Sequence, residues 1–233
     1  DDMLSLSHIS FSYGLVQILD DVSIEVPKAK VVCVMGRNGV GKTTLMRNIV
    51  GLEKASKGTV ILDGHDITKT PARRRAQSGL ALVPQGRMIF PRLSVKENLE
   101  VGLSARTDGC RTIPQEIYDL FPVLSDMGAR QGGNLSGGQQ QQLAIGRALV
   151  GEPRVLLLDE PTEGIQPNVI QAIGQVLRQL VKEKEMTVVL VEQYVDFIKE
   201  FGDHFYIMNR GRVVASGDTP QLSEAIVRQH LSV

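Results

Sequence analysis

Hydrophobic residues follow two different patterns along this chain. In the N-terminal part, apolar and polar residues alternate, which predicts strands that bury one face and leave the other in water. The alternating apolar positions are Leu4, Leu6, Ile9, Phe11, Val22, Ile24 and Val26. A run at 59–62, followed by the turn Asp63-Gly64, extends this pattern. We therefore expect an N-terminal antiparallel β subdomain.

The second pattern consists of short, continuous apolar runs at 31–35, 80–83, 155–158 and 187–191. A strand that is apolar at every position is typical of a parallel sheet with both faces covered. Segments with helical spacing, such as 42–50 and 169–181, separate these runs. This alternation predicts an α/β fold with a parallel core sheet. Each apolar run is too short to cross a bilayer.

Between Gln85 and about Val150 the pattern changes, because strand-like runs are absent from this part of the sequence. The segments with helical character are 95–103, 113–124 and 139–150. We expect a helical subdomain at about 86–150, inserted into the parallel sheet of one domain that spans 1–233. A late hairpin is expected at 205–208 and 212–215, followed by a closing helix at 220–231.

Composition narrows the classes of partner. Lys and Arg total 26, as do Asp and Glu, so the chain of 233 residues has no net charge to attract nucleic acid. Arg73-Arg74-Arg75 is interpreted as a solvated helix face. Cys33 and Cys110 are typical of reduced cytosolic thiols, the chain opens without a leader pattern, and the four histidines lack the spacing of a zinc site.

A phosphate-binding motif follows the first continuous apolar run. It reads Gly36-Arg37-Asn38-Gly39-Val40-Gly41-Lys42-Thr43, which matches G-x-x-x-x-G-K-[ST] between an expected strand and an expected helix. Glycines let successive N–H groups converge on phosphate oxygens, Lys42 adds a positive charge, and Thr43 offers a hydroxyl to Mg²⁺. Kinases and GTPases carry the same loop, so this motif alone does not identify a class.

A second glycine-rich segment, Leu135-Ser136-Gly137-Gly138-Gln139, precedes another expected helix. A Ser and two Gly at a helix start offer N–H groups, taken here to be bare, and the positive end of the helix dipole. Two phosphate-facing elements in one chain suggest that ATP is held between two surfaces.

Acidic residues follow the apolar run at 155–158. Asp159 is placed to hold Mg²⁺ or its water, and the adjacent Glu160 to polarise an attacking water. Because successive side chains alternate across a strand end, the two carboxylates should have different roles. Gln85, after the run at 80–83, has a neutral amide that could reach the metal and the water.

With these motifs in this order, the chain resembles the ATP-binding subunit of an ABC transporter over essentially its whole length. The resemblance implies that ATP is bound by Tyr13, stacked on adenine, by the loop from Gly36 to Thr43, and by Thr44. It implies Mg²⁺ at Thr43, Gln85 and Asp159, catalysis by Glu160 with Gln85 and Gln193, and contact of 135–139 with ATP on the opposite chain.

Two positions depart from the family pattern. Gln193 stands after the run at 187–191 where most members have a histidine, so this switch residue cannot be charged. Gln166 replaces the usual aspartate after the catalytic glutamate, which leaves the customary hydrogen bonding between subunits unassigned. We expect altered tuning and not an inactive enzyme.

Closer resemblance points to the urea-uptake branch of the importers for branched-chain amino acids and amides. It rests on four segments: 36–40, 84–87, 90–93 and 163–167. The function implied is MgATP hydrolysis that powers uptake of urea or short amides. One alternative is the same role for branched-chain amino acids. Others are a soluble ABC ATPase of DNA repair or translation, although a long coiled-coil insertion is absent, and a cassette that binds ATP without hydrolysing it.

The resemblance also implies partners and a location. The chain would form a homodimer, or a heterodimer with a sister ATPase subunit. It would bind membrane permease subunits and depend indirectly on an extracytoplasmic substrate-binding protein, with no nucleic acid. The expected location is cytoplasmic, at the inner face of the plasma membrane.

Overall fold

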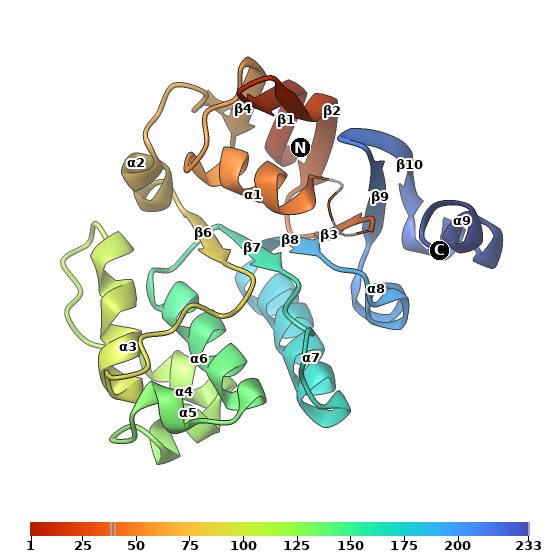
Figure 1. Ribbon diagram of the computed structural model, residues 1–233. Coiled ribbons are helices and arrows are strands. Elements are labelled where there is room, and N and C mark those ends of the chain that lie inside the picture. The colour runs from red at the N-terminus through yellow and green to blue at the C-terminus, as the bar shows by residue number, and fades with distance from the viewer. Residues whose placement is uncertain (38, 40, 233) are drawn as a thin grey trace.

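The computed structural model describes residues 1–37, 39 and 41–232 (Figure 1), so the predictions for Asn38 and Val40 lie outside the described residues. A four-stranded antiparallel sheet has the order β2-β1-β4-β5. Its strands are β1 (Asp2–Tyr13), β2 (Val16–Pro27), β4 (Lys57–Leu62) and β5 (His65–Asp66). The alternating pattern therefore predicted this sheet correctly.

A six-stranded sheet forms the centre of the molecule, with the order β10-β9-β3-β8-β7-β6. Its strands are β3 (Val31–Met35), β6 (Leu80–Val83), β7 (Val155–Asp159), β8 (Thr187–Val191), β9 (His204–Asn209) and β10 (Arg212–Asp218). Neighbouring strands from β9 to β6 run parallel, and β10 is antiparallel to β9. The carboxyl ends of β3, β7 and β8 therefore meet at one edge, where the predicted chemistry lies.

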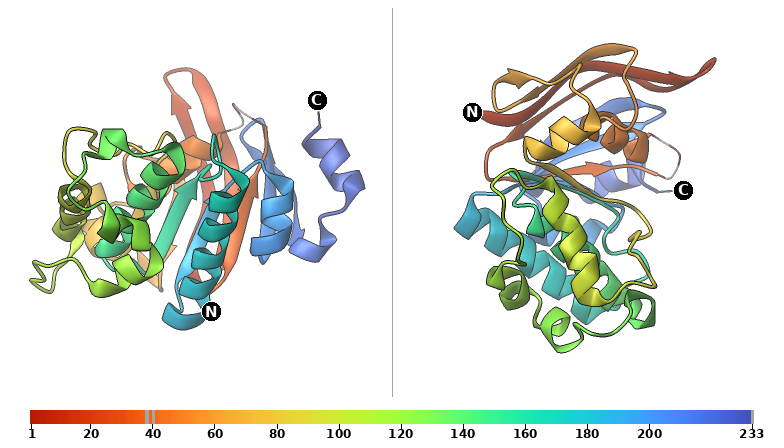
Figure 2. Two further views of the ribbon diagram at one scale, coloured as in Figure 1. Left: turned by 90° about the horizontal axis from the view of Figure 1, so that it is seen from below. Right: turned by 90° about the vertical axis from the view of Figure 1, so that its left-hand side faces the viewer.

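Helices flank the sheets and fill the segment between β6 and β7. They are α1 (Lys42–Val50), α2 (Ala72–Gln77), α3 (Val95–Val101), α4 (Gln115–Leu120), α5 (Pro122–Asp126), α6 (Gly137–Val150), α7 (Pro167–Lys184), α8 (Val195–Phe201) and α9 (Glu224–His230). Helices α3 to α6 gather on one side of the molecule, away from the antiparallel sheet (Figures 1 and 2).

Some helix bounds differ from the sequence-based expectation. The segment expected at 113–124 forms two helices that meet at Phe121, because Pro122 provides no N–H and restricts the residue before it. Helix α6 begins at Gly137, two residues before the expected start, because Ser136 caps it. Among the described residues, no helix is both long and apolar enough to span a bilayer.

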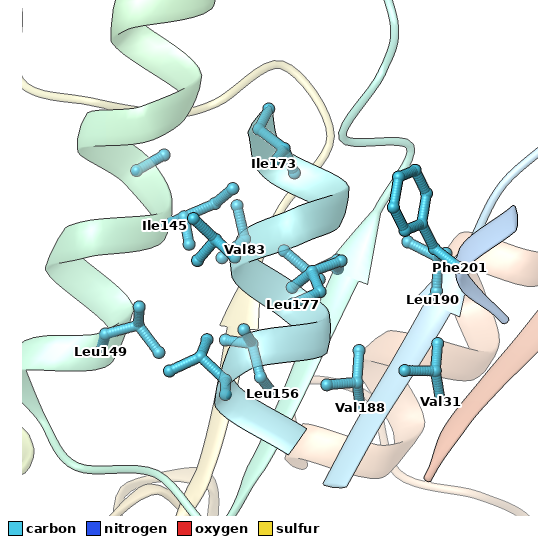
Figure 3. Close-up of a cluster of buried hydrophobic side chains, with 14 of the residues drawn as sticks. Val31, Val83, Ile145, Leu149, Leu156, Ile173, Leu177, Val188, Leu190 and Phe201 are labelled. Atoms are coloured by element: carbon cyan, nitrogen blue, oxygen red, sulfur yellow. The ribbon is translucent and has the colours of Figure 1, made fainter. Parts of the chain in front are cut away.

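Two apolar cores lie on opposite faces of the central sheet. Val31, Leu156 and Val188 face helices α6 and α7, where they pack with Ile145 and Leu177 (Figure 3). Residues in the same strands but offset by one, such as Val32 and Leu157, face α1 and the antiparallel sheet. This burial on both faces explains the continuous apolar runs, and it fixes the strand ends that position the polar residues below.

Candidate active site

The phosphate loop connects the end of β3 to the start of α1. Gly41 precedes α1 with a φ of 97°, a conformation that favours glycine. A Cβ added there would lie 2.9 Å from Leu19 Cδ2 and 3.1 Å from the Ile18 carbonyl oxygen. Gly41 also has no side chain that could cap α1, so the first N–H groups of this helix need another partner. An anion such as a phosphate fits that position.

Lys42 is the first residue of α1, and its side chain is buried. Its Nζ donates to the carbonyl oxygen of Gly36 and lies 3.7 Å from Glu160 Oε1. Burial lowers the pKa of the ammonium, although the carboxylates of Glu160, Asp159 and Glu192 act against that shift. The positive charge is therefore held inside the loop.

Asp159 ends β7, and its side chain is also buried. Its Oδ2 accepts a hydrogen bond of 2.8 Å from Thr43 Oγ1. Its Oδ1 is buried without a hydrogen-bond partner among the described residues. Burial raises the pKa of this carboxyl group. A hydroxyl beside a carboxylate with one unsatisfied oxygen is a donor set that suits Mg²⁺.

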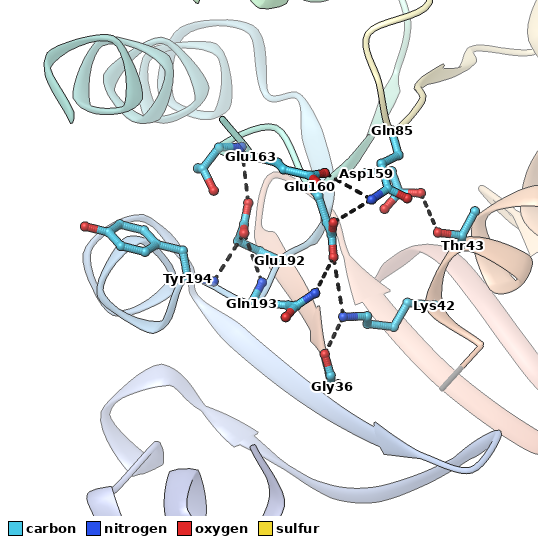
Figure 4. Close-up of polar contacts among 11 residues, drawn as sticks. Gly36, Lys42, Thr43, Gln85, Asp159, Glu160, Glu163, Glu192, Gln193 and Tyr194 are labelled. Carbon is cyan, nitrogen blue, oxygen red and sulfur yellow. Dashed lines mark hydrogen bonds and ion pairs between the residues drawn. The ribbon is translucent and has the colours of Figure 1, made fainter. Parts of the chain in front are cut away.

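Glu160 leaves the strand, because its φ of 48° lies in the left-handed region. Both carboxylate oxygens are held by amides: Gln193 Nε2 donates to Oε1 at 2.7 Å, and Gln85 Nε2 donates to Oε2 at 2.8 Å (Figure 4). Asp159 and Glu160 thus contact different groups, and their different roles stay a prediction. A carboxylate oriented in this way can accept a proton from water.

Gln85 contacts the acidic side of the site. Besides Glu160, its Nε2 reaches Glu163 Oε2 at 3.0 Å. The hydrogen bonds described here join Gln85 to these two glutamates, whereas Thr43 and Asp159 bond to each other. The role of Gln85 as a metal ligand stays a prediction.

Sequence reasoning missed Glu163 and Glu192 as members of this cluster. Glu163 follows three residues after Glu160 in a tight loop, where the Glu163 N–H donates to the Glu160 carbonyl. Glu192 directly precedes Gln193 and is buried. The available signal was an acidic residue next to a continuous apolar strand. Such a residue is expected to be buried, and a buried carboxylate needs hydrogen-bond partners.

The second glycine-rich segment is built differently from the prediction. Ser136 is the N-cap of α6: its Oγ accepts from Gln139 N at 3.2 Å, and Gln139 Oε1 accepts from Ser136 N at 3.0 Å. The expectation of bare N–H groups is therefore wrong for these two amides, since a capping box satisfies them. A Cβ added at Gly137 would make ordinary contacts, 3.5 Å from Arg87 Nη2 and 3.7 Å from the Gly164 carbonyl oxygen. The side chain of Leu135 is buried.

Tyr13 lies at the end of β1 and is about half exposed. Its hydroxyl donates to Glu53 Oε1 at 3.0 Å, and its ring meets Phe11 edge-on at 4.7 Å between centroids. Adenine stacking stays a prediction.

A largely apolar cavity of about 710 Å³ adjoins the site, between α1 and α2 on one side and α3 and α6 on the other. Thr43, Gln85 and Asp159 line one part of it. The remaining lining includes Met46, Leu52, Met88, Val101, Ala144 and Arg147.

Known proteins are similar to this chain in sequence and in fold. A family model described as ABC transporter matches residues 19–163. The chain is 39% identical over 213 residues to the high-affinity branched-chain amino acid transport ATP-binding protein BraG of Pseudomonas aeruginosa, covering 91% of each protein. It is 36% identical over 225 residues to a probable branched-chain amino acid transport ATP-binding protein LivF of Archaeoglobus fulgidus, covering 95% of this chain and 94% of that protein.

Two solved structures extend the comparison to the fold. A nucleotide-free ATP-binding cassette from an ABC transporter superposes with a TM-score of 0.85 and 28% identity, covering 100% of this chain and 96% of that one. A dimeric ATP-binding cassette in a post-hydrolysis state, bound to ADP and Pi, gives a TM-score of 0.85 and 26% identity over 93% of this chain and 99% of that one.

Proposed function

This chain belongs to the ABC transporter family as an ATP-hydrolysing subunit, and we propose that it powers an importer of branched-chain amino acids. Its fold is that of an ATP-binding cassette. The observation that carries the catalytic proposal is the position of the Glu160 carboxylate. Two amide groups donate hydrogen bonds to it, and its Oε1 lies 3.7 Å from the Lys42 ammonium nitrogen.

Glu160 acts as the general base in this proposal. Gln193 and Gln85 each donate to one of its oxygens, which leaves lone pairs available to a water molecule. The ion pair with Lys42 must loosen as phosphate oxygens compete for the same ammonium. Binding of ATP would then release Glu160 toward the attacking water and place Lys42 on the phosphates.

Thr43 and Asp159 fit a magnesium ion, because the unsatisfied Asp159 Oδ1 and the Thr43 hydroxyl lie together beside the phosphate loop. When bound, the ion neutralises charge that develops on the phosphate groups. Burial raises the pKa of Asp159, and the Thr43 hydrogen bond and the Lys42 charge act against that shift.

The second phosphate surface supports a two-chain arrangement. Ser136 and Gln139 form a capping box on their own helix, so this segment is ordered without a ligand. In our proposal, the same segment of another chain completes the Lys42 side of the site. That chain is a second copy or a sister ATPase subunit. A dimeric cassette among the matched structures supports this arrangement.

The apolar cavity beside Gln85 supports docking of a membrane permease. Leu52, Met88 and Val101 line it and are exposed, which is unfavourable unless a partner covers them. Gln85 lies in the same lining, so a segment seated there would contact the loop that bonds to Glu160. The chain would then reside in the cytoplasm at the inner face of the membrane.

The cargo proposal rests on the names of two relatives, both of branched-chain amino acid transport. Urea or a short amide is the second candidate, and only the four short segments noted in the sequence favour it. Specificity would belong to the permease and to an extracytoplasmic binding protein.

The test is reconstitution with the permease that co-purifies and its binding protein, followed by measurement of labelled leucine and labelled urea uptake. We expect ATP-dependent leucine uptake that Glu160→Gln abolishes. Uptake of urea alone would contradict the cargo, and uptake unaffected by Glu160→Gln would contradict the assignment of the base.

A further inference from the structure

Glu192 is a buried carboxylate that the proposed reaction does not use. It follows β8 directly, and only 3% of the residue is exposed. Burial raises the pKa of this carboxyl group, opposed by hydrogen bonds from its neighbours. Burying a carboxylate is unfavourable unless hydrogen bonds satisfy its oxygens, so the contacts of Glu192 indicate what it does.

One oxygen of Glu192 shapes the segment that carries Gln193. Its Oε1 accepts hydrogen bonds from the backbone N–H groups of Gln193, at 2.9 Å, and Tyr194, at 3.2 Å (Figure 4). The chain turns here between β8 and α8. The same segment carries the Gln193 side chain, which donates to Glu160 Oε1 at 2.7 Å.

The other oxygen reaches the segment that follows Glu160. Glu192 Oε2 accepts from the backbone N–H of Thr162 in a longer contact of 3.4 Å. Thr162 lies two residues beyond Glu160, and Glu160 N donates to the Val191 carbonyl at 2.8 Å. Hydrogen bonds of Glu192 and Val191 thus connect the loop that carries Glu160 to the segment that carries Gln193.

We propose that Glu192 is a positioning residue, whose carboxylate holds Gln193 and the loop after Glu160 in the relative placement that their contact requires. This inference rests on the proposed roles of Glu160 and Gln193. Glu192 does not touch the nucleotide in this arrangement and acts through Gln193. A neutral glutamine could keep one acceptor for Gln193 and Tyr194, but its amide nitrogen would face the Thr162 N–H, donor against donor.

The experiment is a double-mutant cycle on the full chain, with ATP turnover and ATP affinity measured separately. We expect Glu192→Gln to lower kcat about threefold and Glu192→Ala about tenfold, because misplacement of a catalytic contact acts on turnover. The Kd for ATP should stay within about twofold. In a Gln193→Ala background, both substitutions should have a smaller effect on kcat than in the parent.

Glu200→Gln is the matched control, since Glu200 lies on the following helix and its side chain accepts from Gln171 Nε2 at 2.9 Å, away from Glu160 and Gln193 in the described hydrogen bonds. Equal kcat losses with and without Gln193 would overturn the proposal, as would parental turnover in Glu192→Ala. Weaker ATP binding with unchanged kcat would assign Glu192 to support of Lys42 and also overturn it. Parental turnover in Glu160→Gln would instead refute the proposed base.

Discussion

Two helices in this chain begin at glycine-rich segments, and their first turns are satisfied in different ways. Helix α1 follows Gly41, which offers no cap, and it begins with a buried lysine among carboxylates. Helix α6 follows Ser136, which forms a complete capping box with Gln139. The first turn of α1 therefore has no side-chain cap and suits an anion, whereas the capping box of α6 already satisfies the N–H groups of Ser136 and Gln139.

This difference separates the two roles that one ATP site needs. The α1 end concentrates charge in a buried place, where Lys42 and Asp159 have pKa values shifted toward their neutral forms by burial. The α6 end is a stable surface that can be presented to another chain. Reactivity and stability are thus divided between the starts of two helices in the same molecule.

Removal of the base should have the largest effect. Glu160→Gln retains the size of the side chain but cannot take a proton, so we expect kcat to fall about 10²- to 10⁴-fold with ATP affinity nearly unchanged. Steady-state phosphate release and nucleotide titration measure the two quantities. If ATP binding fell as severely as turnover, Glu160 would belong to the binding machinery.

Lys42→Ala should weaken ATP binding about 100-fold, which corresponds to about 3 kcal/mol. The reason is that a buried ammonium neutralises phosphates in the ground state as well as in the transition state. Titration with a fluorescent ATP analogue measures the loss. A matched control is Lys199→Ala, on α8 and away from the loop, for which we expect parental affinity.

Gln193 should support turnover without a proton equilibrium. We expect Gln193→Ala to slow turnover about tenfold while ATP still binds, because the contact with Glu160 Oε1 is lost. Gln193→His should retain activity but add a pH-dependent component near pH 6.5 that the parent lacks. Profiles of kcat against pH at saturating MgATP decide this, and full turnover in Gln193→Ala would make Gln193 merely structural.

Asp159→Asn should have the smallest effect, and it should be a gain in stability of the folded protein instead of a loss of function. Burial raises the pKa of Asp159, so its charged form opposes folding above that pKa. At pH 7 without nucleotide, we expect the variant to gain about 1 kcal/mol in unfolding free energy. This gain should vanish as the pH falls through the raised pKa toward the unfolded value of about 4. A gain that persists at pH 4 would contradict the cause.

Much of this molecule could be predicted from its sequence, for physical reasons that particular residues show. Val31 to Met35 is apolar at every position because both faces of β3 are covered, and the glycines after it mark the phosphate loop. The predicted fold class is confirmed by the matched cassette structures.

Other features depend on contacts distant in sequence or on a local signal that went unused. Glu192 also contacts Thr162, 30 residues away in the sequence, and no local pattern reveals that contact. The capping box of α6 was readable, since Ser136 and Gln139 have the S-x-x-Q spacing. Pro122, a visible helix breaker, divided one expected helix into two.

The mass of the Glu160→Gln variant in solution, with and without MgATP, tests most directly whether the two helix ends serve different chains. Multi-angle light scattering at concentrations well above micromolar is the measurement, with the Lys42→Ala/Glu160→Gln double variant as control. We predict a monomer without nucleotide, a dimer with MgATP, and a monomer for the double variant in both conditions. A mass for Glu160→Gln that is the same with and without MgATP would contradict the proposal that ATP is held between α1 of one chain and α6 of another.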